Sequence, residues 1–209
     1  MPHPLFFSFD GMDGSGKSTQ ITQFANLLQK LGHEVLVCRD PGSTELGEKL
    51  RELLLQCDGP LIHRRAEMFL YMAARAQLVE EIIRPALAGG KTVISDRFLL
   101  ANVVYQGHAG GLDVATLWNI GQFATGELEP DMTFVLDLSP DQAFVRINRR
   151  LDRMEQQGEE FRNRLRSGFL REAERNPAKV KIIDATGSEQ QVASDVRTAA
   201  AGLLNDLSE

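Results

Sequence analysis

The sequence has few cysteines and no long apolar run. Its 209 residues include two cysteines, Cys38 and Cys57, and these lack the close spacing of a metal-binding or redox pair. No apolar run approaches the roughly 20 residues that a membrane-spanning helix needs, and the chain begins without a signal-peptide pattern. We therefore expect a cytoplasmic protein that does not contact the membrane.

Positive charge is also scarce relative to negative charge. The chain has 23 Lys and Arg residues against 29 Asp and Glu residues, which gives a formal net charge of −6. Nucleic-acid binding usually depends on many cationic contacts to phosphates, so we expect no nucleic-acid partner. The length and the 43% hydrophobic content are typical of one globular domain over residues 1–209.

Short apolar runs alternate with longer segments of helical pattern along the chain. The predicted strands are Leu5–Asp10, Glu34–Cys38, Thr92–Ser95, Met132–Leu138 and Lys179–Asp184. The predicted helices are Lys17–Leu31, Glu45–Gln56, Arg64–Leu87, which we expect Pro85 to kink, and Ser188–Leu207. This alternation predicts an α/β fold with a parallel five-stranded sheet flanked by helices on both faces.

A phosphate-binding loop follows the first predicted strand. Residues Gly11–Ser18 match G-x-x-x-x-G-K-[ST] at every fixed position, directly between a strand and a helix. Lys17 is expected to reach the β- and γ-phosphates of ATP, and the Ser18 hydroxyl to bind Mg²⁺. The other reading is a glycine-rich turn with an exposed lysine. The residues expected to contact ATP are Gly11, Met12, Asp13, Gly14, Ser15, Gly16, Lys17, Ser18 and Thr19.

Polar residues follow other strands of the predicted sheet. Ligands of such sheets bind beyond the carboxyl ends of the strands, which places Asp10, Arg39, Asp96 and Arg97 around one crevice. A carboxylate in the position of Asp96 suits a second Mg²⁺ ligand. The alternative is a strand-end residue that caps the next helix.

Glu67, Tyr71 and Arg75 recur every four residues and share one helix face. An aromatic ring beside a guanidinium can stack on a flat base and bond its edge. A core tyrosine with a surface arginine paired to the glutamate fits the same spacing. The chain contains no Asn-Lys-x-Asp stretch, which disfavours a GTPase switch.

Ordered motifs run along the chain: Phe9–Thr19, Arg39–Thr44, Leu46–Leu55, Tyr71–Arg75, Asp96–Phe98, Tyr105–Gly107, Pro130–Asp131, Leu151–Glu155 and Ile183–Ala185. Over essentially its whole length the sequence resembles the thymidylate kinase family, in its bacterial branch. The resemblance implies ATP-dependent phosphorylation of dTMP to dTDP in pyrimidine deoxynucleotide biosynthesis, with Mg²⁺ as cofactor. It also implies the fold of P-loop nucleoside monophosphate kinases, a mobile lid at about 146–158 and a homodimer. A kinase for another nucleoside monophosphate and a nucleotide-binding switch protein are the alternatives.

The resemblance also implies roles for residues of the acceptor site. Tyr71 would stack on thymine, and Arg75 would bond the edge of the base. The other implied residues are Asn102 and Gln106 for the nucleoside, Asp13 and Tyr105 for the sugar, and Arg39 and Arg97 for the monophosphate. Asp40 stands where the family more often has Glu, and we expect this shorter carboxylate to contact Mg²⁺ or substrate through water.

The phosphate loop contains no arginine, although the loop of the eukaryotic branch does. An arginine must then come from elsewhere to stabilise charge on the transferred group. The resemblance to the bacterial branch places it in the lid, where Arg149, Arg150 and Arg153 join Lys17 and Arg97 as predicted catalytic residues. A solvated charged face is the alternative for the lid arginines. The charged stretch 146–175 as a whole predicts an exposed, partly helical segment.

Overall fold

The apolar runs of the sequence form one parallel sheet. The computed structural model describes residues 2–147 and 153–205. Its strands are β1 (Phe6–Asp10), β2 (Val35–Arg39), β3 (Thr92–Asp96), β4 (Met132–Asp137) and β5 (Val180–Asp184), in the spatial order β2-β3-β1-β4-β5. All four strand pairs are parallel. The predicted α/β class and five-stranded parallel sheet are confirmed.

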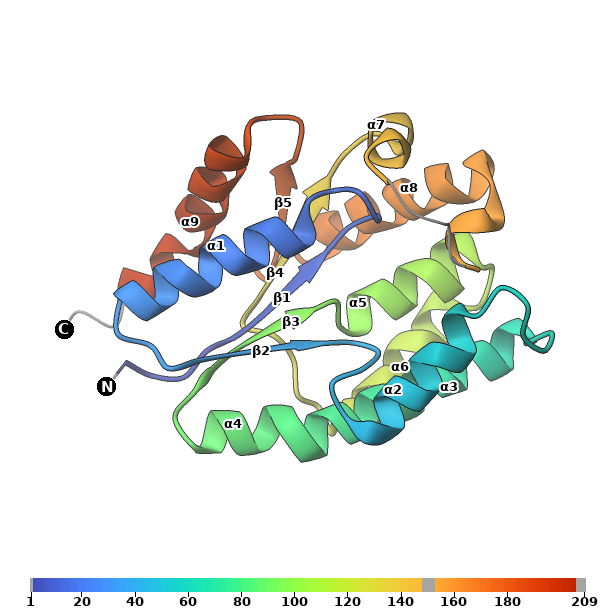
Figure 1. Cartoon of the computed structure of the whole chain (residues 1–209), viewed down its shortest axis with the longest axis horizontal. Helices are drawn as coiled ribbons and strands as arrows, with labels where there is room; N and C mark the ends of the chain where they lie inside the picture. The colour runs from blue at the N-terminus through green and yellow to red at the C-terminus, as the bar shows by residue number, and fades with distance from the viewer. Residues whose placement is uncertain (1, 148–152, 206–209) are drawn as a thin grey trace.

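Helices cover both faces of this sheet (Figure 1). On one face, α1 (Lys17–Lys30) and α9 (Glu189–Asn205) lie side by side and are drawn in blue and red. The remaining α-helices are α2 (Glu45–Leu55), α3 (Arg64–Leu78), α4 (Arg84–Ala88), α5 (Leu99–Asn102), α6 (Val114–Thr125), α7 (Pro140–Val145) and α8 (Glu159–Arg175). Two π-helical segments, η1 (Val79–Ile83) and η2 (Val103–Ala109), and a 3₁₀ turn, η3 (Glu155–Gln157), complete the described elements. No helix among the described residues is long and apolar enough to cross a bilayer.

The helix predicted over residues 64–87 is continuous in direction but changes its winding. Residues of α3 are followed by the π-helical segment η1, and Pro85 lies in the first turn of α4. A proline lacks the N–H that would bond to the preceding turn, and the first turn of a helix tolerates this loss. The change of winding lies in η1, before Pro85, and the kink expected at Pro85 stays a prediction.

Strand β1 separates two parts of the core. Phe7 and Phe9 pack with Phe24 of α1 and Phe134 of β4, with ring centroids 4.9–5.9 Å apart. Phe6 points to the opposite face, because successive strand residues alternate, and its ring lies edge-on to Phe98 at 5.0 Å. The central strand is thus buried on both faces, as its apolar run predicts.

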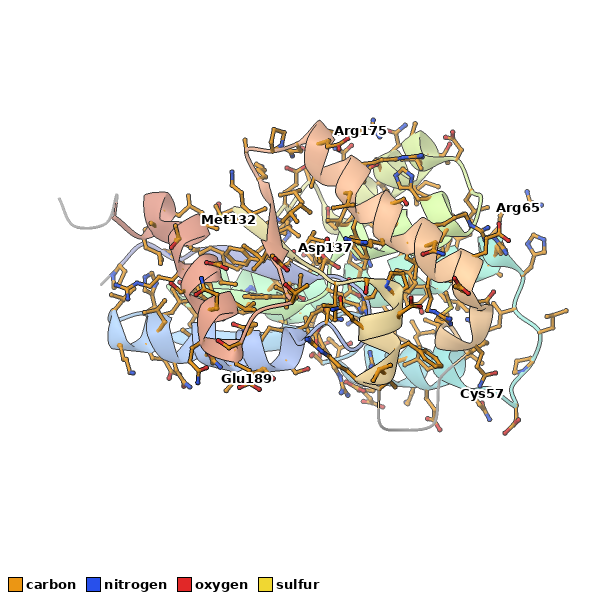
Figure 2. All side chains as sticks on the ribbon, turned by 90° about the horizontal axis from the view of Figure 1, so that it is seen from above. Cys57, Arg65, Met132, Asp137, Arg175 and Glu189 are labelled. Atoms are coloured by element: carbon orange, nitrogen blue, oxygen red, sulfur yellow. The ribbon has the colours of Figure 1, made fainter. Side chains whose placement is uncertain are left out.

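Helix α8 differs from the exposed segment that its charge predicts. Phe161, Leu165 and Phe169 are buried at a spacing of four residues, and the helix contacts η2 and β5. Arg166 of α8 donates two hydrogen bonds of 2.8 Å to Asp137 at the carboxyl end of β4, labelled in Figure 2. The prediction of an exposed segment over all of 146–175 is therefore wrong for α8. The lid bounds 146–158 stay a prediction, since residues 148–152 lie outside the described part.

Candidate phosphoryl-transfer site

The phosphate loop joins the end of β1 to the start of α1. Gly11 has φ 125° and Gly16 has φ 93°, conformations that residues with a side chain rarely adopt. A Cβ atom on Gly11 would lie 2.6 Å from the carbonyl oxygen of Leu136, so the loop packs directly against the end of β4. The turn favours glycine at both positions, and the close approach to Leu136 excludes a side chain at Gly11 as well.

The side chain of Lys17 contacts the backbone of the phosphate loop. Its side chain is 7% exposed, and its ammonium donates hydrogen bonds to the carbonyl oxygens of Gly11 at 3.1 Å and Met12 at 2.9 Å. Asp13 Oδ1 lies 3.6 Å from the same nitrogen. Burial, and then the charge of Arg97, lower the pKa of Lys17. The lysine is therefore held at the mouth of the loop, beside the positive end of α1.

A cavity of about 880 Å³ opens over the loop. Arg39, Asp96 and Arg97 line it from the ends of β2 and β3, which confirms that these strand ends meet. Its far end is lined by Arg146, after α7, and by the turn from Ala185 to Glu189. Arg146 donates to the carbonyl oxygen of Ala185 at 3.3 Å. We did not predict a site role for Arg146.

Asp10 lies under the crevice and not around it. Its side chain is fully buried, and neither carboxylate oxygen has a hydrogen-bond partner among the described residues. Burial raises its pKa to about 7, while Arg97 and Lys17 act in the opposite direction. The prediction that Asp10 borders the crevice is therefore wrong, because the phosphate loop covers the end of β1.

Arg97 is fixed from several sides. Its backbone has φ 68°, a left-handed conformation that costs on the order of 1 kcal/mol for a residue other than glycine. Its guanidinium donates to the Gly11 carbonyl at 3.0 Å and to Asp13 at 2.8 Å, and lies 5.1 Å from the ring centre of Tyr105. Arg97 thus links the phosphate loop to the acceptor side of the site.

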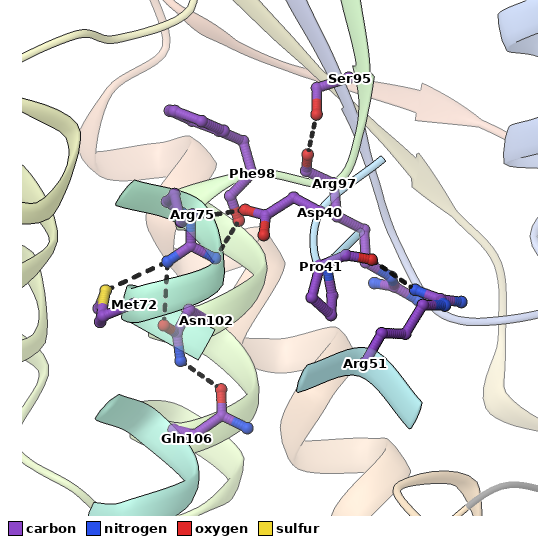
Figure 3. Close-up of polar contacts among 10 residues, drawn as sticks. All are labelled: Asp40, Pro41, Arg51, Met72, Arg75, Ser95, Arg97, Phe98, Asn102 and Gln106. Atoms are coloured by element: carbon purple, nitrogen blue, oxygen red, sulfur yellow. Dashed lines mark hydrogen bonds and ion pairs between the residues drawn. The ribbon is translucent and has the colours of Figure 1, made fainter. Parts of the chain in front are cut away.

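Three arginines converge where β2 and β3 end. Arg39 pairs with Glu48 at 2.7 Å and is half exposed, whereas Arg51 of α2 donates to the Pro41 carbonyl at 3.0 Å (Figure 3). Burial, and then Arg39 and Arg97, lower the pKa of Arg51. A cluster of like charges that is stabilised by an anion is the expected form of a phosphate site. Arg51 was not predicted as a site residue, although it shares a helix face with buried Gly47 and Leu54.

A second cavity, of about 90 Å³, adjoins the first. Most of the predicted acceptor residues line it together: Asp13, Tyr71, Arg75, Arg97, Asn102, Tyr105 and Gln106. Arg39 lines the larger cavity instead. Asp13, Asp40, Arg51 and Arg97 border both cavities, so these residues mark the place where the two meet.

Arg75 is buried and lines this second cavity, and Figure 3 shows its polar contacts. Its Nε donates to Asp40 at 2.6 Å, Nη1 to Asn102 Oδ1 at 3.0 Å and to Met72 Sδ at 3.2 Å, and Nη2 to the Phe98 carbonyl at 3.4 Å. The alternative of a surface arginine paired with Glu67 is wrong, because Arg75 is buried and pairs with Asp40. The expectation that Asp40 contacts Mg²⁺ or substrate through water stays a prediction.

One N–H of Arg75 remains available to a ligand. A guanidinium carries five N–H groups, and the contacts above use four of them within the described part of the chain. Because its side chain is 2% exposed, that group can reach only a ligand that enters the cavity. The arrangement suits recognition of a flat acceptor edge.

The donor set fits a magnesium ion bound mostly by phosphate and water. Ser18 and Asp96 line the larger cavity and offer hard oxygen atoms. The described residues contain no group of three or more acidic, histidine or cysteine side chains that could hold a metal ion. Mg²⁺ commonly binds through one or two protein ligands together with nucleotide phosphates, so these two residues are sufficient candidates.

The structure describes one of the three predicted lid arginines. Arg149 and Arg150 lie outside the described residues. Arg153 is described: its Nε donates to the Leu54 carbonyl at 2.8 Å, and its Nη2 lies 2.6 Å from Glu67 Oε2. Arg153 thus connects the residues that precede η3 to Leu54 of α2 and Glu67 of α3.

Comparisons with known proteins agree with this geometry. A family model described as "Thymidylate kinase" matches residues 9–196. A thymidylate kinase of Rhodopirellula baltica is 45% identical over 196 residues, covering 93% of this chain and 80% of the relative. A thymidylate kinase of Syntrophotalea carbinolica is 38% identical, with 96% and 97% covered. The crystal structure of thymidylate kinase from Ehrlichia chaffeensis superposes with a TM-score of 0.75 at 28% identity, over 94% of this chain and 98% of that one.

Proposed function

The chain belongs to the thymidylate kinase family, and from this premise we propose that it transfers the γ-phosphoryl group of ATP to dTMP. The observation that carries the proposal is the junction of two cavities at Asp13, Arg51 and Arg97. One cavity is lined by the phosphate loop, and the other is lined by two tyrosines, three arginines and two amides. A donor triphosphate and a nucleoside monophosphate placed in them would meet phosphate to phosphate.

The proposed reaction is an in-line displacement. The bond from the γ-phosphorus to the β–γ bridging oxygen breaks as a dTMP phosphate oxygen bonds to that phosphorus, which yields ADP and dTDP. The acceptor oxygen is already anionic at neutral pH, since the second pKa of a phosphate is near 6, so no general base is needed. The protein contributes positioning and fixed positive charge.

The phosphates are assigned to the loop and to the arginine cluster. The backbone of Gly11–Thr19 would cradle the donor phosphates, and Lys17 would move from the loop carbonyls to the β- and γ-phosphates. Arg39, Arg51 and Arg97 would hold the acceptor phosphate. Ser18 and Asp96 would hold Mg²⁺, which supplies charge neutralisation on the phosphates when bound.

The base and sugar are assigned to the smaller cavity. Tyr71 would stack on thymine, Arg75 would donate to a base oxygen, and Asn102 and Gln106 would complete the edge contacts. Asp13 would meet the sugar 3′-hydroxyl. Tyr105, held against Arg97, would leave no room for a ribose 2′-hydroxyl.

A lid over residues 146–158 would close over both ligands and exclude water. Arg149, Arg150 or Arg153 would then stabilise charge on the transferred group. The contacts of Arg153 with Leu54 and Glu67 favour Arg149 and Arg150 for that role, since Arg153 is already occupied in the described conformation.

The assembly is proposed to be a homodimer formed through α2, α3 and α6. Helix α3 contacts the other two, and each of the three presents a substantially exposed apolar residue: Leu46 at 45%, Phe69 at 56% and Phe123 at 88% exposure. Exposed aromatic residues on adjoining helices are typical of an interface. We also propose a cytoplasmic location, which agrees with two free cysteines.

A panel of nucleoside monophosphates offered with ATP and Mg²⁺ tests the reaction and the acceptor together. We expect ADP and dTDP to form, with dTMP preferred over dUMP, dCMP and dGMP. Preference for another monophosphate would identify a different kinase. ATP binding without transfer to any acceptor would instead support a nucleotide-binding switch.

A further inference from the structure

Arg162 of α8 has no place in the reaction described above, and its charge has no opposite charge beside it. The side chain is half-buried, and its Nε atom is buried without a hydrogen-bond partner in the described part of the chain. Its guanidinium lies over the ring of Phe144 of α7, with Cζ 4.7 Å from the ring centre. A guanidinium held against an aromatic face keeps its N–H groups available to an anion.

Arg162 borders a third cavity, of about 30 Å³, which adjoins both cavities of the site. Asp13 and Ile147 line this third cavity and the larger one, and Asp13, Tyr105 and Met154 line it and the smaller one. A space of this volume holds about one water molecule and is too small for a phosphate group. The third cavity therefore leaves room for the guanidinium to shift toward the junction at Asp13.

The other arginines that line cavities of the site are already bonded within the protein. Each of them donates a hydrogen bond to a side chain or a backbone carbonyl: Arg39 to Glu48, Arg51 to Pro41, Arg75 to Asp40, Arg97 to Asp13 and Arg146 to Ala185. In the part of the chain that the structure describes, Arg162 is the one arginine among these cavity linings that donates no such bond. It is thus the uncommitted cation of the site.

Helix α8 presents Arg162 to the carboxyl ends of the strands. Arg162 and Arg166 are one turn apart and share a helix face. Arg166 is held by Asp137 at the end of β4, with two bonds of 2.8 Å. Buried Phe161 and Leu165 fix the same part of α8 in the core. The backbone that carries Arg162 is therefore fixed, whereas its guanidinium has no such anchor.

Helix α7 brings the aromatic partner of Arg162 up to the phosphate loop. Helices α7 and α8 are in contact and lie side by side in Figure 1. A Cβ atom on Gly14 of the loop would collide with the carbonyl oxygen of Ala143, the residue before Phe144. The ring that holds Arg162 therefore belongs to a helix that packs directly on the loop.

The proposed reaction requires more positive charge at this junction than the loop provides. In the transition state, negative charge is spread over the three outer oxygens of the transferred phosphoryl group. The arginines at the ends of β2 and β3 are assigned to the acceptor phosphate, and Arg153 is bonded to Leu54 and paired with Glu67. A paired set of N–H groups suits phosphoryl oxygens, and an uncommitted guanidinium breaks no existing bond to reach them.

We propose that Arg162 is a further catalytic residue, whose guanidinium leaves the Phe144 ring when both substrates are bound and donates hydrogen bonds to oxygens of the transferred phosphoryl group. The inference rests on the proposed function, since it concerns the same transfer. The bond from the γ-phosphorus to the bridging oxygen breaks and its electron pair stays with ADP, while a dTMP oxygen bonds to that phosphorus. Arg162 transfers no proton and stays charged throughout.

The decisive variant is Arg162→Gln, assayed with saturating ATP, Mg²⁺ and dTMP. We expect kcat to fall by about 100-fold or more, while the KM values for ATP and dTMP stay within about threefold of wild type, because the lost contact forms only in the transition state. Arg171→Gln removes an exposed arginine of the same helix and should leave kcat unchanged. A wild-type kcat in folded Arg162→Gln protein would overturn the inference.

Two more variants separate catalysis from packing. Phe144→Leu removes the ring and keeps Arg162, so we expect kcat within about threefold of wild type. A loss as large as that of Arg162→Gln would overturn the inference, because the contact between the two side chains would then be what matters. Should Arg162→Gln fail to fold, Arg162→Lys keeps the charge and replaces the paired N–H groups by one ammonium. We expect it to lose at least about tenfold in kcat, and a wild-type kcat would again overturn the inference.

The wild-type protein tells a failure of this inference from a failure of the proposed function. If it phosphorylates a monophosphate other than dTMP, the proposed acceptor is wrong, and the same comparison of kcat values with that acceptor decides the role of Arg162. A wild-type protein that transfers phosphate to no acceptor would refute both proposals.

Discussion

Asp10 gives a stability prediction that follows directly from its burial. Its pKa is raised from 3.8 to about 7, first by burial, with Asp96 and Asp40 adding to the effect. The unfolded chain releases this proton near the lower value and the folded chain near the higher one. Between them the folded state binds more protons, so the stability contributed by protonated Asp10 is complete at low pH and is lost as the pH rises toward 7.

The size of the effect follows from the difference between the two pKa values. A difference of about 3 pH units at about 1.4 kcal/mol per unit gives about 4 kcal/mol in total, of which about 3 kcal/mol falls between about pH 5 and about pH 8. In Asp10→Asn this pH-dependent contribution is absent. We therefore expect the unfolding free energy of the variant, relative to wild type, to increase by about 3 kcal/mol over that range.

Urea unfolding of the nucleotide-free protein at the two pH values measures this change. The amide of the variant has its own desolvation cost, but that cost does not vary with pH. The quantity to compare is therefore the variant-minus-wild-type difference in unfolding free energy at about pH 8, less the same difference at about pH 5. Asp141→Asn, at an exposed position in the first turn of α7, is the matched control and should show no such change. A gap between Asp10→Asn and wild type that stays constant with pH would refute the reasoning.

Three further predictions concern the site and the assembly. Lys17→Ala should abolish dTDP formation while the melting temperature stays within a few degrees of wild type, and retained turnover in a coupled assay would contradict its role. Arg75→Ala should raise the KM for dTMP far more than that for ATP, and should lower stability by about 3 kcal/mol or more because Asp40 is left buried without its ion pair. Equal losses for both substrates would argue against base recognition. Phe123→Asp should convert the proposed dimer to monomer in sedimentation experiments, and an unchanged sedimentation coefficient would place the interface elsewhere.

Local patterns were sufficient for much of the fold. The phosphate loop, the strand before it and the helix after it depend on residues that are adjacent in the chain, so spacing alone located them. The stretch from Leu99 to Thr125 was different: it forms α5, η2 and α6, none of which was predicted. Glycines at 107, 110 and 111 interrupt its helical periodicity, and packing against α3 and α8 supplies the stability that the local sequence lacks.

Most of the predicted acceptor residues line one cavity, but the partner of Arg75 within the protein was not predicted. Tyr71, Asn102 and Gln106 line one cavity as expected, and the resemblance to a family, more than the periodicity, selected them. Arg75 could not be assigned its partner from the helix that bears it. The carboxylate that shares a face with it on that helix is Glu67, whereas the actual partner, Asp40, comes from the end of β2.

The sequence by itself located the phosphate-loop motif and determined the order in which the strands and several of the helices follow. Tertiary structure alone decided that Asp10 is covered, that Arg51 lines the same cavity as Arg39 and Arg97, and that buried Glu67 accepts a hydrogen bond from Gln106. The physical reason is that burial and hydrogen-bond direction depend on atoms brought together from distant segments. Spacing along one helix or strand does not specify those atoms.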